Sequence, residues 1–310
     1  MHPLDSLHGL CPIQATNDIE ASFRVLPGYR RAHARGECYE AVFRSNGQAA
    51  PWTTAPHLQA VDSAAIVRFS QSSPDPAQSD VMSLVKGMAV QFKQPDGMVS
   101  NFVGVTLPVF FARTPASFMD LIGDYRRAKS GELTIADMIK DMAEHFAEGK
   151  NSLLAAGHLL PPLSYATCRY YGIHTFLLRD QDDHLQPVKF EWQPDAGVHT
   201  VPLSGFTELP QQYMADEMAQ RLAREEVSFR LHIVLGEEGD PLDDPTTRWP
   251  NSRRRIEAGQ LSILRSVDEP HDLFMDPARV SQGIELTDDP ILHFRSDVYA
   301  ESWRRRTDGG

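Results

Sequence analysis

The sequence predicts an α+β fold in which antiparallel strands lie before and after a helical segment. Several short runs alternate apolar with polar residues, and clusters rich in Pro, Asp, Ser and Gly separate them. One long stretch near the middle has helical spacing instead. Strands that follow one another through turns, with no helix between them, are typical of an antiparallel meander rather than of βαβ units.

The first half of the chain contains three of these runs and the helical stretch. VDSAAIVRFS begins at residue 61 and stops in QSSPDPAQSD, which predicts a strand followed by a loop. GMAVQFK, before the turn QPDGM, and NFVGVTLPVFFAR predict two further strands. Residues 134–160 carry apolar residues at helical spacing around charged ones and predict a helix.

The second half continues with strands and ends in a helix. RYYGIHTFLLRD and PVKFEWQPDAG flank the turn QDDH and predict a β-hairpin. MADEMAQRLAREEVSFRLHIVL predicts a helix running into a strand, and residues 236–251, rich in Asp, Pro and Gly, predict a surface loop. ILHFRSDVYAESWRRR predicts one last helix.

Composition limits the classes of function. The 310 residues are 41% hydrophobic, enough for a substantial core, and the formal net charge of −12 argues against nucleic acid or an anionic membrane as the main partner. Three cysteines without CxxC spacing predict no disulfide framework. The N-terminal MHPLDSLHGL has no apolar stretch typical of a signal peptide, so we expect a cytoplasmic protein, or a periplasmic one if a leader has been removed.

Two small groups of residues suggest chemistry. His33 lies in the run RRAHARG, where neighbouring arginines lower the pKa of an imidazole and favour its neutral form, which can serve as a base or a ligand. Arg295 and Tyr299 stand one helical turn apart. A guanidinium beside a phenol stabilises a tyrosinate, which is a hard anionic ligand suited to ferric iron. Taken alone, each group is also compatible with an ordinary structural role.

Taken together, the ordered segments resemble the haem catalase family over about residues 27–306. The resemblance rests on RRAHARG around His33, VRFS at 67–70, KGMAVQFKQPDG at 86–97, VGVTLPVFFARTPASF at 103–118, YYGIHTF at 170–176, VKFEWQPDAG at 188–197, FMDPARVSQGIELTDDPIL at 274–292 and RSDVY at 295–299. It implies a single domain over residues 1–310, with residues 1–20 as an N-terminal arm. It also implies an eight-stranded antiparallel β-barrel with surrounding helices, and a haem b with ferric iron buried in that barrel.

The resemblance also assigns roles by position. His33 corresponds to the distal acid/base, Ser70 to its hydrogen-bond partner and Tyr299 to the axial ligand of the haem iron. The remaining residues correspond to positions that bind or support the haem: Arg295, His174 and Asp289 behind the tyrosinate, Arg30, Arg68 and Arg306 at the haem propionates, and Phe110 and Phe118 in the pocket lining. Arg31 and Arg35 receive no role. Planar guanidinium groups suit carboxylates well, which agrees with the propionate assignment.

One position departs from the pattern of strongly dismutating catalases. Those enzymes have GNN before PVFF, and the first Asn helps the distal His to hold peroxide, whereas this chain has Gly104, Val105 and Thr106. A valine side chain has no hydrogen-bond donor. Asn101 lies nearby, but we expect the strand to point it elsewhere. The chain also lacks the helical C-terminal region of full-length catalases, as in the small catalase-related peroxidases.

The resulting hypothesis is an oxidoreductase of the oxidative stress response. It would be a haem peroxidase that reduces hydrogen peroxide or organic hydroperoxides with a small organic electron donor, with weak or no catalase activity. The nearest alternative is a small true catalase in which Thr106 or a water replaces the missing amide. Two further readings are a hydroperoxide-rearranging enzyme, which Ala32 before His33 disfavours, and a haem-binding module without turnover, which His33 and Ser70 disfavour. A homo-oligomer is compatible with the resemblance.

Overall fold

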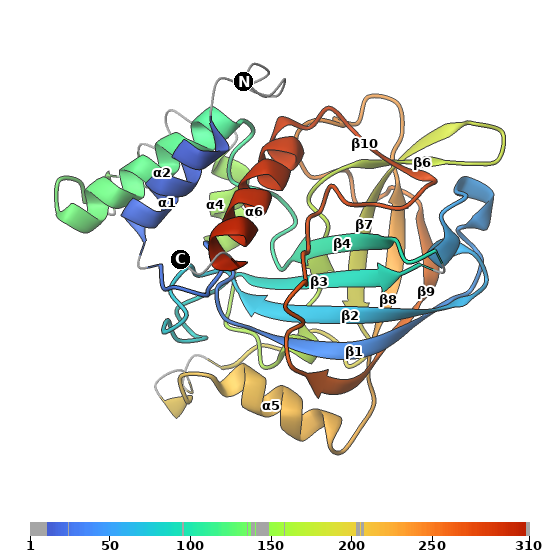
Figure 1. The fold of residues 1–310 in the computed structure, drawn as a ribbon, viewed down its shortest axis with the longest axis horizontal. Helices are drawn as coiled ribbons and strands as arrows, with labels where there is room; N and C mark the ends of the chain where they lie inside the picture. Colours follow the sequence, from blue (N-terminus) through green and yellow to red (C-terminus); the bar gives the residue numbers. More distant parts are fainter. Residues whose placement is uncertain are drawn as a thin grey trace.

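A closed antiparallel barrel forms the centre of the computed structural model (Figure 1). The structure describes residues 11–307, apart from residues 24, 95, 135, 138–139, 141–148, 158, 203–204 and 206–207. The eight barrel strands are β1 (Gly36–Ser45), β2 (Asp62–Gln71), β3 (Lys86–Lys93), β4 (Val99–Val105), β5 (Tyr170–Tyr171), β7 (Leu185–Pro194), β8 (Val227–Leu235) and β9 (Arg255–Val267). The pairing of β7 with both β5 and β8 closes the barrel, and β6 (Phe176–Arg179) and β10 (Ile284–Leu286) extend the sheet from β7.

Aromatic side chains fill the interior of the barrel. Phe43 of β1 contacts Trp192 of β7, with ring centroids 6.1 Å apart, and Phe69 of β2 contacts Phe229 of β8 at 5.7 Å. These strands are not neighbours in the sheet, so the rings meet across the lumen. Because side chains alternate along a strand, the neighbours of Phe69 on β2 point to the outside of the barrel. A haem held by those neighbours would lie against the outer face of the barrel, and not inside the barrel as the resemblance led us to expect.

The described helices pack outside the barrel. They are α1 (Pro12–Ser22), α2 (Pro115–Ser130), α4 (Gly149–Gly157), α5 (Tyr213–Leu222) and α6 (Pro290–Thr307), with single 3₁₀ turns at Ala50–Trp52, Pro56–Leu58 and Tyr165–Thr167. In Figure 1, α1 and α2 lie side by side at one end of the barrel, and α6 lies next to them. A small apolar cluster that includes Ile19, Phe294 and Val298 joins α1 to α6. Among the described residues, no helix is long and apolar enough to cross a membrane.

Most elements predicted from the sequence are confirmed. The three early runs form β2, β3 and β4, and the predicted hairpin is β6 paired with β7. The predicted helix followed by a strand is α5 and β8, and the C-terminal helix is α6. Residues 236–251 form a loop, although Trp249 within it is buried. Of the helix predicted for residues 134–160, α4 is present, and much of the rest lies outside the described residues.

Candidate active site

His33 and Ser70 form a pair on the outer face of the barrel. His33 Nδ1 lies 2.9 Å from the Oγ of Ser70, which is near the end of β2. Gly87 of β3 makes this pair fit, because a Cβ on Gly87 would lie 2.8 Å from both His33 Nδ1 and Ser70 Oγ. Burial, and then the charges of Arg68 and Arg295, lower the pKa of His33 to about 3. His33 is therefore a neutral imidazole at physiological pH.

Val105 lies in the same cross-strand row as this pair. Ser70 is opposite Gly87 on β3, and Gly87 is opposite Val105 on β4. Residues in one row of an antiparallel sheet share a face, so the side chains of Ser70 and Val105 flank Gly87 on the side where His33 lies. The position that carries an amide in strongly dismutating catalases is therefore apolar beside His33.

Asn101 does not replace that amide, but the reason differs from the one expected. Residues four apart on a strand share a face, so Asn101 and Val105 point to the same side, and the expectation that the strand turns Asn101 elsewhere is wrong. Asn101 is instead about 13 Å farther along β4 by the usual rise of a strand. Its amide donates to the carbonyl oxygen of Asp276 at 2.9 Å. Asn101 is therefore kept away from His33 by its distance along β4 and by its hydrogen bond to Asp276, although its side chain points to the same face.

The arginines on either side of His33 each have an acidic partner. Arg31 Nε donates to Glu20 of α1 at 2.7 Å, and Arg35 forms an ion pair with the buried carboxylate of Asp80. Glu20 also accepts from Arg305 of α6 at 2.8 Å. These contacts fix the segment that carries His33 on both sides, which accounts for the two arginines that the sequence left without a role.

Arg30, Arg68 and Arg306 converge on one carboxylate. Glu269 Oε2 accepts from Arg68 Nε at 2.9 Å, and Glu269 Oε1 accepts from Arg306 at 2.8 Å and from Arg30. Burial alone would raise the pKa of Glu269, but the charges of Arg30 and Arg68 outweigh it and lower the pKa to about 2. The three residues predicted to bind propionates are therefore brought together, and they bind a carboxylate in this structure.

Four other predicted residues form a continuous hydrogen-bonded chain that ends at Tyr299. Arg295 donates to the Tyr299 hydroxyl and to His174 Nε2, each at 2.8 Å, and His174 Nδ1 lies 2.7 Å from Asp289 Oδ2. A guanidinium only donates, so Nε2 of His174 must accept, and its Nδ1–H donates to Asp289. Burial lowers the pKa of His174 to about 4, which agrees with this neutral tautomer.

Phe110 and Phe118 lie beside this chain. Their ring centroids are 6.0 Å apart, and the guanidinium of Arg295 lies 6.0 Å from the Phe110 ring. Phe118 also contacts Phe294 of α6. Both residues thus belong to a group of packed aromatic rings, and Phe110 in this group contacts Arg295.

The donor groups suit a cofactor that carries carboxylates and an iron with an open coordination position. Three guanidinium groups already hold a carboxylate, and Tyr299 lies on α6 two helical turns before Arg306, which is one of the three. Trp303 lies one turn after Tyr299, and its buried indole Nε1 has no hydrogen-bond partner among the described residues, so it is a further donor. These residues fit a haem.

Sequence reasoning missed Gly87, Glu269 and Trp303. Two of the three residues had a weak signal in the sequence: Gly87 is a glycine inside an apolar strand, and Trp303 lies at helical spacing from Tyr299. Glu269 gave no signal, because its partners are distant in sequence.

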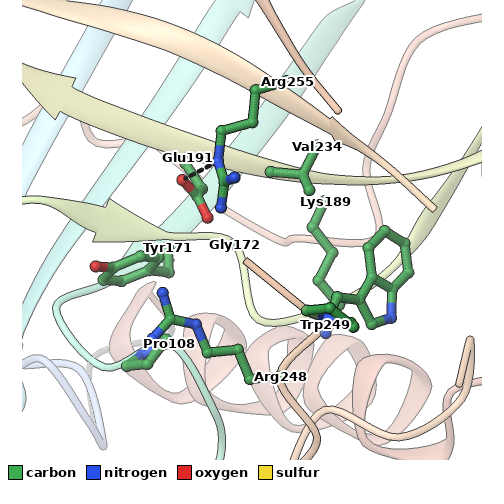
Figure 2. A pocket seen from close by; sticks show the side chains of 10 residues that line it. Pro108, Tyr171, Gly172, Lys189, Glu191, Val234, Arg248, Trp249 and Arg255 are labelled. Carbon is green, nitrogen blue, oxygen red and sulfur yellow. Dashed lines mark ion pairs between the residues drawn. The ribbon is translucent and has the colours of Figure 1, made fainter. Parts of the chain in front are cut away.

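A separate surface cavity is lined by other residues. Figure 2 shows Tyr171, Lys189, Arg248 and Trp249 around it, together with the ion pair between Arg255 and Glu191 at 3.5 Å. Burial lowers the pKa of Lys189 to about 8. The residues that line this cavity include none of the site residues predicted from the sequence.

Comparisons with known proteins agree with this geometry. The catalase family model matches residues 24–310. A catalase-related peroxidase from Mycolicibacterium paratuberculosis is 31% identical, over 96% of both chains, and one from Synechococcus elongatus is 28% identical, over 97% of this chain and 90% of its own. Catalase-2 from Bacillus subtilis is 25% identical over 90% of this chain but only 44% of its own length.

The fold also agrees with solved catalase structures. A fungal catalase structure superposes with a TM-score of 0.80 at 20% sequence identity, covering 91% of this chain and 60% of the fungal chain. A bacterial catalase structure has the same TM-score, and the match covers 58% of the bacterial chain. The eight-stranded barrel with outer helices is therefore the catalase barrel, and the match spans about three fifths of each of these two larger chains. The chain belongs to the catalase family.

Proposed function

We propose that this chain is a haem peroxidase that reduces hydrogen peroxide or small organic hydroperoxides with an organic electron donor, and that its catalase activity is weak or absent. The cofactor is haem b with ferric iron. The observation that carries the proposal is the cross-strand row of Ser70, Gly87 and Val105. His33 contacts Ser70 in this row, and the row carries no amide side chain on the same face. The names of the relatives that span nearly the whole chain support the peroxidase reading.

In this proposal the chain holds the haem at three places. Tyr299 would bind the haem iron through its phenolate oxygen, and Arg295 would oppose the negative charge of that phenolate. Asp289 and His174 keep Arg295 in place through the chain of hydrogen bonds. Arg30, Arg68 and Arg306 bind the propionates, and Phe110 and Phe118 cover apolar parts of the ring. The bound haem supplies the redox chemistry that breaks the O–O bond and accepts electrons from the donor.

His33 moves the proton that this reaction requires. With Nδ1–H donated to Ser70 Oγ, the imidazole keeps a lone pair on Nε2. Nε2 would take a proton from one peroxide oxygen and return it to the other as the O–O bond breaks, so that the second oxygen departs as water or as an alcohol. Ser70 keeps the imidazole in the tautomer and orientation that the transfer needs.

Val105 decides between the two activities. When an organic donor supplies the electrons, the site needs to bind only one peroxide molecule in each cycle. Dismutation also requires a second peroxide molecule to be positioned as the reductant. The absence of one hydrogen bond at this place weakens transition-state binding by roughly 1–3 kcal/mol, which corresponds to about one to two factors of ten in rate. The alternative of a small true catalase needs a substitute donor. The nearest candidate is Thr106, whose hydroxyl oxygen accepts from the Lys86 amide at 3.0 Å and whose O–H is left to donate.

Restoring the amide tests the proposal. We expect Val105→Asn to raise oxygen release from peroxide by about tenfold or more relative to oxidation of a phenolic donor. Val103→Asn is the matched control, because Val103 lies on the same face one pleat away. An unchanged ratio in Val105→Asn, or the same gain in both variants, would show that Val105 does not limit dismutation.

A further inference from the structure

Glu269 occupies the donors that the proposed function assigns to the haem propionates. Both of its carboxylate oxygens accept hydrogen bonds from the arginine trio, by which we mean Arg30, Arg68 and Arg306. The trio comes from three parts of the chain: the segment before β1, strand β2 and helix α6. A single side chain therefore joins these three elements at the place where a carboxylate-bearing cofactor would bind.

The charges of the trio require a partner in the haem-free protein. Side-chain exposures are 19% for Arg30, 5% for Arg68 and 12% for Arg306, so the three guanidinium groups are largely removed from water. Like charges at such close range repel one another, and a buried charge without a counterion is costly. Glu269 supplies one full negative charge between them. It thereby stabilises the chain before any cofactor is present.

The position of Glu269 allows it to leave. It follows β9 by two residues, in the segment between β9 and β10 that contains no described helix or strand, and its side chain is 27% exposed. A rotation toward solvent would free the trio without moving a barrel strand. A propionate is a carboxylate of the same shape and charge, so it can take over the same N–H groups.

We propose that Glu269 is an internal substitute for a haem propionate, which pairs the arginine trio in the haem-free chain and is displaced when haem binds. This inference rests on the proposed function, since it takes the trio as the propionate site. The proposal has one consequence for the stability of the haem-free protein and another for its affinity for haem. Glu269 stabilises the haem-free protein, and it lowers the affinity for haem because its own bonds must be broken first.

Haem titration of purified haem-free protein tests the inference without any peroxide. We expect Glu269→Gln to lower the melting temperature of the haem-free protein and to tighten binding of ferric haem by about ten- to hundredfold, the fold-change that corresponds to one charge-assisted hydrogen bond. Asp268→Asn is the matched control, because it removes the same charge from an exposed neighbour. It should change neither quantity.

A haem whose propionates are esterified provides the second arm. It carries no carboxylate to compete with Glu269, so Glu269→Gln should leave its affinity within about twofold of the wild-type value. If Glu269→Gln does not fold without haem, the protein is prepared loaded, and haem transfer to excess apomyoglobin is timed. The transfer should then be slower from the variant than from the wild type.

The outcomes separate this inference from the proposed function. Haem binding by the wild type with an unchanged or weaker affinity in Glu269→Gln, or with no slowing of haem transfer, overturns the role of Glu269 alone. An equal gain with the esterified haem also overturns it. A wild-type protein that binds haem without tyrosinate ligation, or not at all, overturns the proposed function.

Discussion

At the scale of single residues, His33 has a backbone conformation that an ordinary side chain avoids. Its φ is +54°, in the left-handed region, which costs a residue with a Cβ about 1 kcal/mol. Hydrogen bonds hold the segment there, since Ala34 N donates to the carbonyl of Ser73 at 3.0 Å. Strain at a residue that also carries a perturbed pKa is typical of a functional site.

Replacing His33 by two small residues separates strain from chemistry. We expect the free energy of unfolding of haem-free His33→Gly to exceed that of His33→Ala by about 1 kcal/mol, because glycine adopts positive φ without penalty. Both variants should still bind haem and lose about 10²- to 10⁴-fold of their peroxide reactivity, because neither has a base. Urea denaturation and donor oxidation measure the two effects. Equal stabilities would mean that His33 is not strained.

Sequence reasoning succeeded for residues whose chemistry depends on residue type, and it failed where the role depends on what lies nearby. The resemblance placed His33 with Ser70, and it placed Asp289, His174 and Arg295 with Tyr299. Each of these two groups is joined by hydrogen bonds in the structure. The importance of Gly87 depends on an imidazole that crosses it from a distant segment. No local pattern contains that information.

At the scale of elements, helix α6 is capped by a residue that also belongs to the candidate site. Asp289 Oδ1 accepts from the amides of Ile291 and Leu292, at 2.9 and 3.2 Å, and so caps the first turn. Its Oδ2 accepts from His174. One carboxylate thus fixes both the start of the helix that carries Tyr299 and the orientation of the imidazole that supports Arg295.

Substitution of Asp289 can separate these two roles. Asparagine remains a good cap, so Asp289→Ala should cost about 1–2 kcal/mol of unfolding free energy more than Asp289→Asn. The asparagine NH₂ would face the Nδ1–H of His174, donor against donor, and the link from His174 to Arg295 would be lost. We therefore expect both variants to change the absorption spectrum of tyrosinate-bound haem. A wild-type spectrum in Asp289→Asn would contradict the chain of hydrogen bonds.

Helices and strands were predictable from the sequence where apolar residues recur at a regular spacing. β1 and β9 were not predicted, because glycine, cysteine and charged residues interrupt their apolar pattern. Gly259 of β9 takes a positive φ where the backbone of β1 approaches closely, so it marks an irregular place in the strand. The pairing of these two strands supplies the context that their sequences lack.

At the scale of the whole molecule, two buried histidines and the half-buried His33 link stability to pH. Burial lowers the pKa of His33 and of His57 to about 3 and that of His174 to about 4, all below the ordinary value of 6.5. Below pH 6.5 the unfolded chain therefore binds protons that the folded chain does not. The folded state loses stability as the pH falls from 6.5 toward 4.

We expect the free energy of unfolding of the haem-free protein to fall steadily from pH 7 to pH 5, by up to roughly 1.4 kcal/mol per pH unit for each of the three histidines. His57 stacks on Phe92 inside the core, away from the residues of the site. His57→Gln should therefore reduce this slope without changing haem binding. Urea denaturation at several pH values measures it, and a stability that is constant between pH 7 and pH 5 would contradict the assignment of neutral histidines.

Closure of the barrel was beyond the reach of sequence patterns. Alternating runs predict strands, but not that β7 pairs with both β5 and β8 to complete a ring. Only the family resemblance implied eight strands. The location of the site outside the barrel follows from the packed lumen, which depends on contacts between strands that are far apart in sequence.

The central claim is that His33 works beside Val105 as a peroxidase base without the amide that dismutation needs. Its most direct test is a paired assay on the haem-loaded wild-type chain, with oxygen release from hydrogen peroxide measured beside oxidation of a phenolic donor at the same peroxide concentration. We expect rapid oxidation of the donor with little oxygen release. Oxygen release at the rate of a full-length catalase, with slow oxidation of the donor, would contradict the claim.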